Sequence, residues 1–414
     1  MYKMYKRVKN CRICNSANLV KYLDLGNMPL ANSLLEEKDK NKPELKFPLE
    51  VMYCKDCSLS QLSIVVNPKV LFLKYFYRSS ISKTFQQHCA QMAGQAFEMT
   101  NSYANKNNLA VDIASNDGCL LKEFRNKGFK VLGVEPAENI AKIANLNGIE
   151  TICSFWGDET ASAILKKYGK ARIITATNVL AHVDDLNGFL NAVKILLDDN
   201  GLFIVEVPYL YNLLSKNEFD TVYHEHLSYF LVRPLKKLYD SHKLKIIKIE
   251  KYQIHGGSIR IFASKNSLSE ESSIKKFQKF ERSKKLYDIN TYKNFDKKAK
   301  KVRKDLLNIL AGIKNKNKKI AAYGASAKGN TLLNYCGIDR KIVRFIIDDT
   351  PEKQNLISPG SKIRIVDSGY LNKENPDYII LLAWNFAGEI IQKTKSVYKR
   401  KVKYIIPIPY VRVI

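Results

Sequence analysis

Short apolar runs alternate with helix-like segments through the middle of the chain, beginning at residue 109. Each run ends at Pro, Gly or a cluster of polar residues, as buried strands do. Residues 184–197, between the third and fourth runs, have helical spacing with Asp184 or Asp185 as the cap. Strands that alternate with helices predict an open, mostly parallel, doubly wound α/β sheet. Its predicted strands are residues 109–113, 130–135, 172–178 and 201–207.

Three segments surround this region. Residues 81–105 are expected to form a helix with Phe85, Met92 and Phe97 on its apolar side. Two later runs, 244–249 and 258–263, lie close enough in sequence to pair antiparallel and close one edge of the sheet.

The alternation restarts near the C-terminus, after a Lys-rich stretch at 275–319 that predicts one or two helices. A strand at 319–323, a loop at 324–329 and a helix from 330 predict a second, smaller Rossmann-like unit. Its remaining strands are expected at 342–347, 378–383 and 403–406.

The first 80 residues predict short irregular segments and contain four of the eight cysteines, in two C-x-x-C pairs. Two such pairs can supply four thiolates to one Zn²⁺ in tetrahedral geometry. A redox-active pair would leave the other pair unexplained, and four buried thiols are the plainer alternative. We favour a structural zinc, because four protein ligands leave no position for a substrate. The expected ligands are Cys11, Cys14, Cys54 and Cys57.

Length and composition set the broad class. The chain has 414 residues, of which 45% are apolar, and this predicts a globular protein of two or three domains. It has no run of about 18 apolar residues that would predict a membrane span. The basic start leads into Cys11 rather than an apolar stretch, unlike a signal peptide. We therefore expect a cytoplasmic protein with reduced thiols.

The formal net charge of +28 is open to two interpretations. A charge of this size can indicate nucleic acid or an anionic membrane. The densest block, 275–319, mixes Lys with acidic and apolar residues, which favours the solvated face of a helix. The sequence has no aromatic–basic motif typical of RNA-binding modules. We expect no nucleic-acid or membrane partner, and an anionic substrate such as a diphosphate would suit the charge.

The loop after the first predicted strand indicates the cofactor. A dinucleotide fold prefers G-x-G-x-x-G here, but this loop has only Gly118. S-adenosylmethionine (SAM) has no phosphate and needs polar groups for its amino-acid end and an acid for its ribose. Glu135, about 20 residues on, suits the ribose, whereas a simple Asn-Asp-Gly turn is the plainer alternative. The expected SAM-binding residues are Asp112, Ser115, Asn116, Asp117, Gly118, Glu135, Pro136 and Asn178.

Histidines cluster in two segments. His182 follows a predicted strand, at the edge where ligands bind in open α/β sheets. Residues 223–228 read Y-H-E-H-L-S, a costly composition for a core and a natural one for a site. A metal on the H-x-H pair is disfavoured, because no third ligand lies near in sequence. A general base is favoured, and it could remove a proton from a carbon beside a ketone that holds the enolate charge.

Eight motifs in order make the chain resemble the sugar C-methyltransferases of deoxysugar pathways, over nearly its whole length. The motifs are C-R-x-C at 11–14, C-x-x-C-x-L-x-Q-L at 54–62, Y-x-Y-x-S-S at 75–80, S-N-D-G at 115–118, N-V-L-A-H-V at 178–183, Y-H-E-H-L-S-Y at 223–229, H-G-G-S at 255–258 and Y-G-A-S-A-K-G-N at 323–330.

The resemblance implies three parts. These are a zinc module over residues 1–80, a class I SAM-methyltransferase sheet over 81–272, and a helical linker with a C-terminal Rossmann-like domain over 273–414. It also implies methylation of C3 of a nucleotide-diphosphate 4-keto-6-deoxy sugar, in branched-chain deoxysugar biosynthesis. An O- or N-methyltransferase, an RNA methyltransferase and a scaffold with a degenerate methyltransferase fold remain the alternatives.

The same resemblance implies residue roles. His226 is the implied base for the C3 proton, assisted by Tyr223, Glu225 and His182. Lys328, near a predicted helix N-terminus, suits the diphosphate. The loop also departs from the family, because Ser326 stands where many members have Pro. The implied substrate-binding residues are Tyr77, Ser80, His255, Lys328, Asn330 and Asp348, with Asp349 beside the last.

Overall fold

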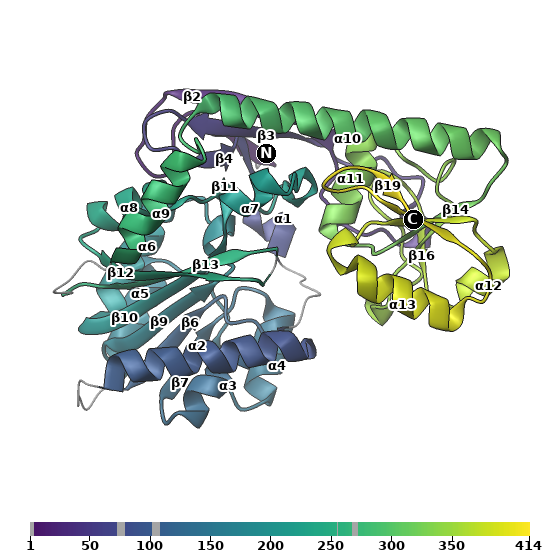
Figure 1. Ribbon diagram of the computed structural model, residues 1–414. Coiled ribbons are helices and arrows are strands. Elements are labelled where there is room, and N and C mark those ends of the chain that lie inside the picture. Colours follow the sequence, from purple (N-terminus) through teal and green to yellow (C-terminus); the bar gives the residue numbers. More distant parts are fainter. Residues whose placement is uncertain (1–3, 73–78, 102–107, 255, 267–271) are drawn as a thin grey trace.

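The computed structural model describes residues 4–72, 79–101, 108–254, 256–266 and 272–414 (Figure 1). Its three larger sheets have four, seven and six strands. The long helix α10 (Ile289–Asn315) runs from the N-terminal sheet to the six-stranded sheet (Figure 1). Within the described ranges, no helix combines the length and the apolar character needed to cross a membrane.

The seven-stranded sheet confirms the predicted doubly wound α/β architecture. Five neighbouring strands, from β10 to β8, are parallel, and β13 and β12 add an antiparallel edge. The expected antiparallel pair is therefore also confirmed. In spatial order the strands are β12 (Lys245–Tyr252), β13 (Ser258–Ser264), β10 (Leu197–Pro208), β9 (Ala171–Thr177), β6 (Leu109–Ile113), β7 (Lys130–Val134) and β8 (Thr151–Ile152).

Helices cover both faces of this sheet, because successive side chains of a buried strand point to opposite faces. In β6, Ala110 packs beneath α2 (Lys83–Asn101) and α3 (Cys119–Asn126). Val111 belongs to the opposite core, which includes α5 (Asp158–Tyr168), α6 (Leu186–Leu196) and α8 (Val232–Ser241). Asp185 caps α6 as predicted, since its carboxylate accepts from the Gly188 N–H at 2.8 Å.

The N-terminal sheet is more regular than the sequence analysis expected. Residues 47–54 alternate between buried and half-buried positions, a strand signal that the sequence analysis missed. The edge strand β11 comes from a distant part of the chain, because in sequence it follows β10 of the seven-stranded sheet. The strands in order are β11 (Ser228–Tyr229), β4 (Ser60–Leu62), β3 (Phe47–Cys54) and β2 (Leu19–Met28), and β1 (Tyr5–Arg7) pairs separately with β5 (Ile64–Val66).

The four cysteines of this module come together. All four Sγ atoms lie within 4.8 Å of one another, with 3.4 Å between Cys11 and Cys57 and 3.6 Å between Cys14 and Cys54. Tetrahedral zinc with Zn–S bonds of about 2.3 Å needs sulfurs slightly under 4 Å apart. The donor set and its spacing therefore fit a closed zinc site.

The six-stranded sheet is the second Rossmann-like unit, with β14 (Ile320–Tyr323) beside both β15 and β17. Two predicted boundaries were wrong. The helix α11 (Ala327–Cys336) begins earlier than residue 330, and β15 (Phe345–Ile347) begins later than 342. The other strands are β16 (Arg364–Val366), β17 (Tyr378–Leu381), β18 (Lys403–Ile406) and an antiparallel β19 (Arg412–Val413).

The Lys-rich stretch forms two helices, α9 (Ser272–Ser283) and α10. In α10 the buried residues recur at spacings of three and four, which makes one apolar stripe. Lys300 and Lys301 lie on the exposed side and pair with Asp296 and Asp305 at i±4. The charge of this helix is thus on a solvated face.

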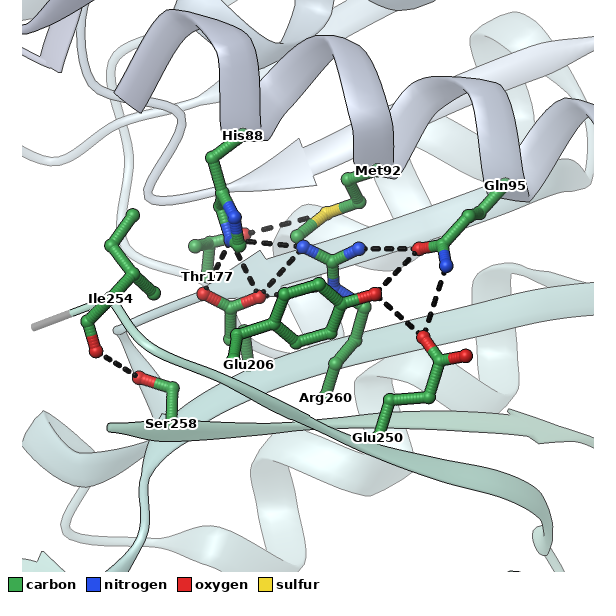
Figure 2. A network of polar contacts seen from close by, with 10 residues as sticks. His88, Met92, Gln95, Thr177, Glu206, Glu250, Ile254, Ser258 and Arg260 are labelled. Atoms are coloured by element: carbon green, nitrogen blue, oxygen red, sulfur yellow. Dashed lines mark hydrogen bonds and ion pairs between the residues drawn. The ribbon is translucent and has the colours of Figure 1, made fainter. Parts of the chain in front are cut away.

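A buried polar network attaches α2 to the sheet. Figure 2 shows His88 and Gln95 of α2 directed at Glu206 of β10 and Arg260 of β13. The Arg260 Nε–H donates to Glu206 Oε2 at 3.0 Å, and both side chains are fully buried. Burial would raise the pKa of Glu206, but His88 and Arg260 outweigh it and hold that pKa below its usual range.

We expect Arg260→Met to destabilise the protein by about 3–5 kcal/mol, because it leaves the Glu206 carboxylate buried without its cation. Urea denaturation followed by circular dichroism measures this. Lys248→Met, which removes a partly exposed ion pair to Glu250 from β12, is the matched control and should cost about 1 kcal/mol or less. Equal effects of the two changes would contradict the assignment.

Cys57→Ser should remove zinc from the purified protein, whereas Cys153→Ser should retain about one zinc per chain. The second variant is the control, because Cys153 is exposed and lies outside the cluster. Metal analysis of protein purified without chelator makes the measurement. Zinc retained at full occupancy by Cys57→Ser would count against a four-cysteine site.

Candidate active site

The loop between β6 and α3 has an unfavourable backbone conformation that contacts with neighbouring residues must stabilise. Ala114, Asn116 and Gly118 have φ values of 55°, 51° and 82°, a region unfavourable to residues with a Cβ. Glu135, which follows β7, holds this loop. Its Oε2 accepts from the Asn116 N–H at 2.9 Å, and its Oε1 accepts from the Ala137 N–H at 2.9 Å. Its expected contact with a ribose stays a prediction.

Two carboxyl groups beneath the loop have altered acidity. Asp112 accepts from the Thr175 hydroxyl at 2.6 Å. Burial outweighs that bond and raises the pKa of Asp112 to about 7, and burial likewise raises the pKa of Glu135. A cation bound nearby would favour their ionised forms. The sulfonium and ammonium groups of SAM are such cations.

Polar atoms around the loop are buried without a hydrogen-bond partner in the part of the chain that the structure describes. They are Ser115 Oγ, Asp117 Oδ1 and Asn178 Oδ1. Such a group costs about 1–3 kcal/mol when left unpaired, so a ligand that pairs it is stabilised. The set offers acceptors for an ammonium and for hydroxyls, and it fits SAM. Pro136 leads from this loop region toward α4 (Glu138–Leu146).

The same loop also fixes the chain before α2. Asn116 Oδ1 accepts from the Ser79 N–H at 2.9 Å, and Asp117 Oδ2 accepts from the Ser80 hydroxyl at 2.5 Å. Ser80, expected at the substrate, therefore lies against the cofactor loop. Tyr77 and His255 lie outside the described residues, so their roles stay predictions.

His226 has a defined tautomer. Its Nδ1–H donates to the Thr221 carbonyl oxygen at 2.9 Å, because that oxygen can only accept. Nε2 is then the unprotonated nitrogen, and it accepts from the Tyr223 hydroxyl at 2.8 Å. Burial, together with the nearby His182 and Lys328, lowers the pKa of His226 to about 3. The imidazole is neutral at pH 7 and can accept a proton.

Two further predicted residues flank this base. The His182 ring, in the short helix η3 (Leu180–His182), lies 5.0 Å from the His226 ring, and burial lowers its pKa to about 4. Glu225 Oε1 accepts from the Asn32 amide at 2.7 Å, and burial raises the pKa of Glu225 to about 7. Sequence analysis missed Asn32, because its contact joins segments 193 residues apart.

The two histidines of the H-x-H pair have different partners. His224 is buried, and its Nε2 lies 3.3 Å from the Phe47 carbonyl oxygen of β3. His226 contacts Tyr223 and Thr221 instead. His224 therefore attaches the segment to the N-terminal sheet, while His226 belongs to the site.

The cofactor loop and the base lie over the same strand ends. β6 and β9 are paired, with Asp112 opposite Thr175. The chain leaves β9 through Asn178, which has a φ of 57° and whose N–H donates to the Glu206 carbonyl oxygen at 2.8 Å. It then reaches His182, whose ring contacts His226. His226 is thus next to the edge at which the loop between β6 and α3 begins.

The C-terminal unit contributes Lys328, whose ammonium lies 5.3 Å from the centre of the Trp384 ring. The Trp384 indole N–H donates to Asp220 Oδ2 at 2.7 Å. Burial raises the pKa of Asp220 to about 6, while Lys328 and Trp384 lower it. Sequence analysis missed Asp220 and Trp384, because they lie outside every motif.

Other C-terminal residues that were expected at the substrate brace the fold in this structure. Asp348 Oδ2 accepts from the Ala325 N–H at 2.7 Å, and Asn330 Nδ2 donates to the Ala31 carbonyl oxygen at 2.8 Å. Ser326 caps α11 by accepting from the Gly329 N–H at 3.2 Å. Substrate contacts of Asn330 and Asp348 stay predictions.

Two solved methyltransferases are similar to part of the chain. A SAM-dependent methyltransferase from Clostridium acetobutylicum is 16% identical, with a TM-score of 0.36, over 44% of this chain and 92% of that one. Magnesium protoporphyrin IX methyltransferase (ChlM) from Synechocystis is 13% identical, with a TM-score of 0.35, over 44% and 83%.

Sequence comparisons cover the whole chain. Family models match residues 11–72 as a putative zinc-binding domain, 90–249 as a methyltransferase domain and 253–409 as a C-methyltransferase C-terminal domain. C-methyltransferase NovU from Streptomyces niveus is 36% identical over 100% of this chain and 99% of its own length. The chain therefore belongs to the family of SAM-dependent C-methyltransferases.

Proposed function

We propose that this enzyme methylates C3 of a nucleotide-diphosphate 4-keto-6-deoxy sugar, in branched-chain deoxysugar biosynthesis in the cytoplasm. The observation that carries the proposal is His226, a neutral imidazole whose unprotonated Nε2 lies beside the cofactor edge of the sheet. Carbon methylation needs a base, because the carbon must lose a proton before it can attack. SAM, when bound, supplies the electrophilic methyl group.

The residues around His226 suit this chemistry. A C4 ketone acidifies the C3–H bond, and His226 Nε2 takes the proton. The Tyr223 hydroxyl, which donates to that nitrogen in the resting structure, is placed to donate to the ketone oxygen as negative charge develops there. Glu225, when ionised, stabilises the imidazolium that forms. His182 completes the wall of the site.

The C-terminal unit is the proposed site of the nucleotide part. Lys328 lies in the first turn of α11, where an ammonium beside a helix N-terminus favours a diphosphate. The remaining residues of the proposed substrate site are Tyr77, Ser80, His255, Asn330 and Asp348. The net charge of +28 also favours an anionic substrate.

Proton exchange tests the carbon chemistry. The enzyme is incubated in heavy water with a thymidine- or guanosine-diphosphate 4-keto-6-deoxy sugar and S-adenosylhomocysteine, which cannot donate methyl. We expect enzyme-dependent deuterium at C3, read by NMR, because the base acts before methyl transfer. Exchange at C5 instead would refute the C3 position. No exchange under conditions that support turnover would favour O- or N-methylation.

His226→Gln should lower both C3 exchange and methyl transfer by about 10²–10⁴-fold, the usual contribution of a general base. Glutamine keeps a polar side chain of similar size but cannot take the proton. SAM affinity, measured by calorimetry, should stay within about twofold, because His226 is outside the expected SAM-binding residues. Retention of wild-type exchange would show that another group is the base.

Glu225→Gln should lower activity and stabilise the fold at high pH. The folded-state pKa of Glu225 is raised to about 7. The protonated carboxyl group therefore does not lower the free energy of unfolding below the ordinary pKa of Glu. As pH rises through 7 the buried group ionises, and the free energy of unfolding falls. Removing the charge should add on the order of 3 kcal/mol at about pH 9 and little at about pH 5. Urea denaturation at both values makes the measurement. Glu98→Gln, an exposed control on α2, should change stability by under about 0.5 kcal/mol at either pH.

A further inference from the structure

Arg12 lies between the first two zinc-site cysteines, yet its side chain points away from them and into the protein. The guanidinium is buried, and its Nη1 donates to the carbonyl oxygens of Leu62 and Leu227, each at 3.1 Å. Its Nε donates to Asp184 Oδ1 at 3.2 Å. One side chain therefore contacts three segments that are far apart in sequence.

Two of these segments carry the histidines of the site. Leu227 directly follows His226, and Asp184 comes two residues after His182. The contact to Leu227 is reinforced, because the Leu62 N–H also donates to its carbonyl oxygen at 2.9 Å. The two histidine rings lie 5.0 Å apart, so a side chain joined to both segments bears on their relative position.

The main chain of Arg12 is held as firmly as its side chain. Its N–H donates to Gln61 Oε1 at 2.9 Å, and its carbonyl oxygen accepts from Asn187 Nδ2 at 2.9 Å. Asn187 lies in the first turn of α6, directly after the Asp184 region. The cysteine turn thereby contacts both β4 and α6.

We propose that Arg12 is a positioning residue, which fixes the His182 and His226 segments relative to each other and couples the zinc turn to catalysis. The inference rests on the proposed role of His226 as base. Only Arg presents several N–H groups in a rigid planar fork, so one side chain can hold two carbonyl oxygens and a carboxylate together. Zinc at Cys11 and Cys14 would set the backbone on either side of that fork without touching the substrate.

The test compares Arg12→Lys and Arg12→Met with Arg7→Met, which removes an exposed arginine of the same module. Both Arg12 variants should keep about one zinc per chain and bind SAM within about twofold of wild type. Their kcat and C3 exchange should fall at least about tenfold with KM nearly unchanged, since a displacement of about 1 Å can cost 10²-fold. Lysine should restore part of the loss seen with methionine. Arg7→Met should match wild type.

The result that overturns the proposal is wild-type kcat in both Arg12 variants, or a loss that appears only together with lost zinc or lost SAM binding. Should Arg12→Met fail to fold, Asp184→Asn is the second variant, because it removes the charge that Arg12 contacts in the His182 segment. Lys6→Met, which removes the other ion pair of Asp184, is its control and should leave kcat unchanged. Asp184→Asn should lower kcat. The double variant with Arg12→Lys should lose less kcat than the product of the two single fold-losses, as expected for residues that act through one contact. Independent effects would refute the coupling.

Failure of the proposed base role gives a different pattern. In that case the wild-type enzyme transfers methyl without exchanging the C3 proton, or His226→Gln retains wild-type exchange. The Arg12 variants are then compared by methyl transfer alone, where an unchanged kcat overturns the positioning role and a lowered kcat with intact SAM binding supports it.

Discussion

The pairing of β11 with β4 is the contact on which the arrangement of the site depends. β11 follows the base in sequence but is an edge strand of the N-terminal sheet. A ladder of two residue pairs is weak alone, so the segment needs the side-chain contacts of Arg12 and His224 as well. His226, the proposed base, is therefore supported by the zinc module, although it belongs in sequence to the methyltransferase sheet.

Desolvation sets the charges of this site. Burial disfavours whichever form is charged, so it lowers the pKa of His182 and His226 and raises that of Glu225. The same physical cause makes both the imidazoles and the carboxyl group less charged at neutral pH. A cationic cofactor and an anionic substrate would then bring most of the charge into the site. A proton acceptor is available there before either arrives.

The two Rossmann-like sheets share one interaction, a carboxylate that accepts a hydrogen bond from a loop, at equivalent places. Glu135 and Asp348 each follow the second strand of a sheet, and each accepts a hydrogen bond from the loop after the first strand. In both cases the acid holds a loop that leads into a helix N-terminus. The loops differ in the groups near them that could bind a ligand. Buried unpaired polar atoms lie at the first loop, and Lys328 lies at the second.

Local patterns were enough to determine the alternation of strands and helices, the antiparallel edge and the four-cysteine cluster, because each depends on residues close in sequence or on a short motif. They also limited the cap of α6 to Asp184 or Asp185. They also indicated the segments that contain His182 and His226. Only the tertiary structure decided that β11 joins the N-terminal sheet, that Asn32 contacts Glu225, and that Arg12 reaches both histidine segments. These contacts join residues that lie 167 to 215 positions apart in sequence. Spacing within a motif carries no information about them, since they arise only when separate hydrophobic cores pack together and bury the polar groups between them.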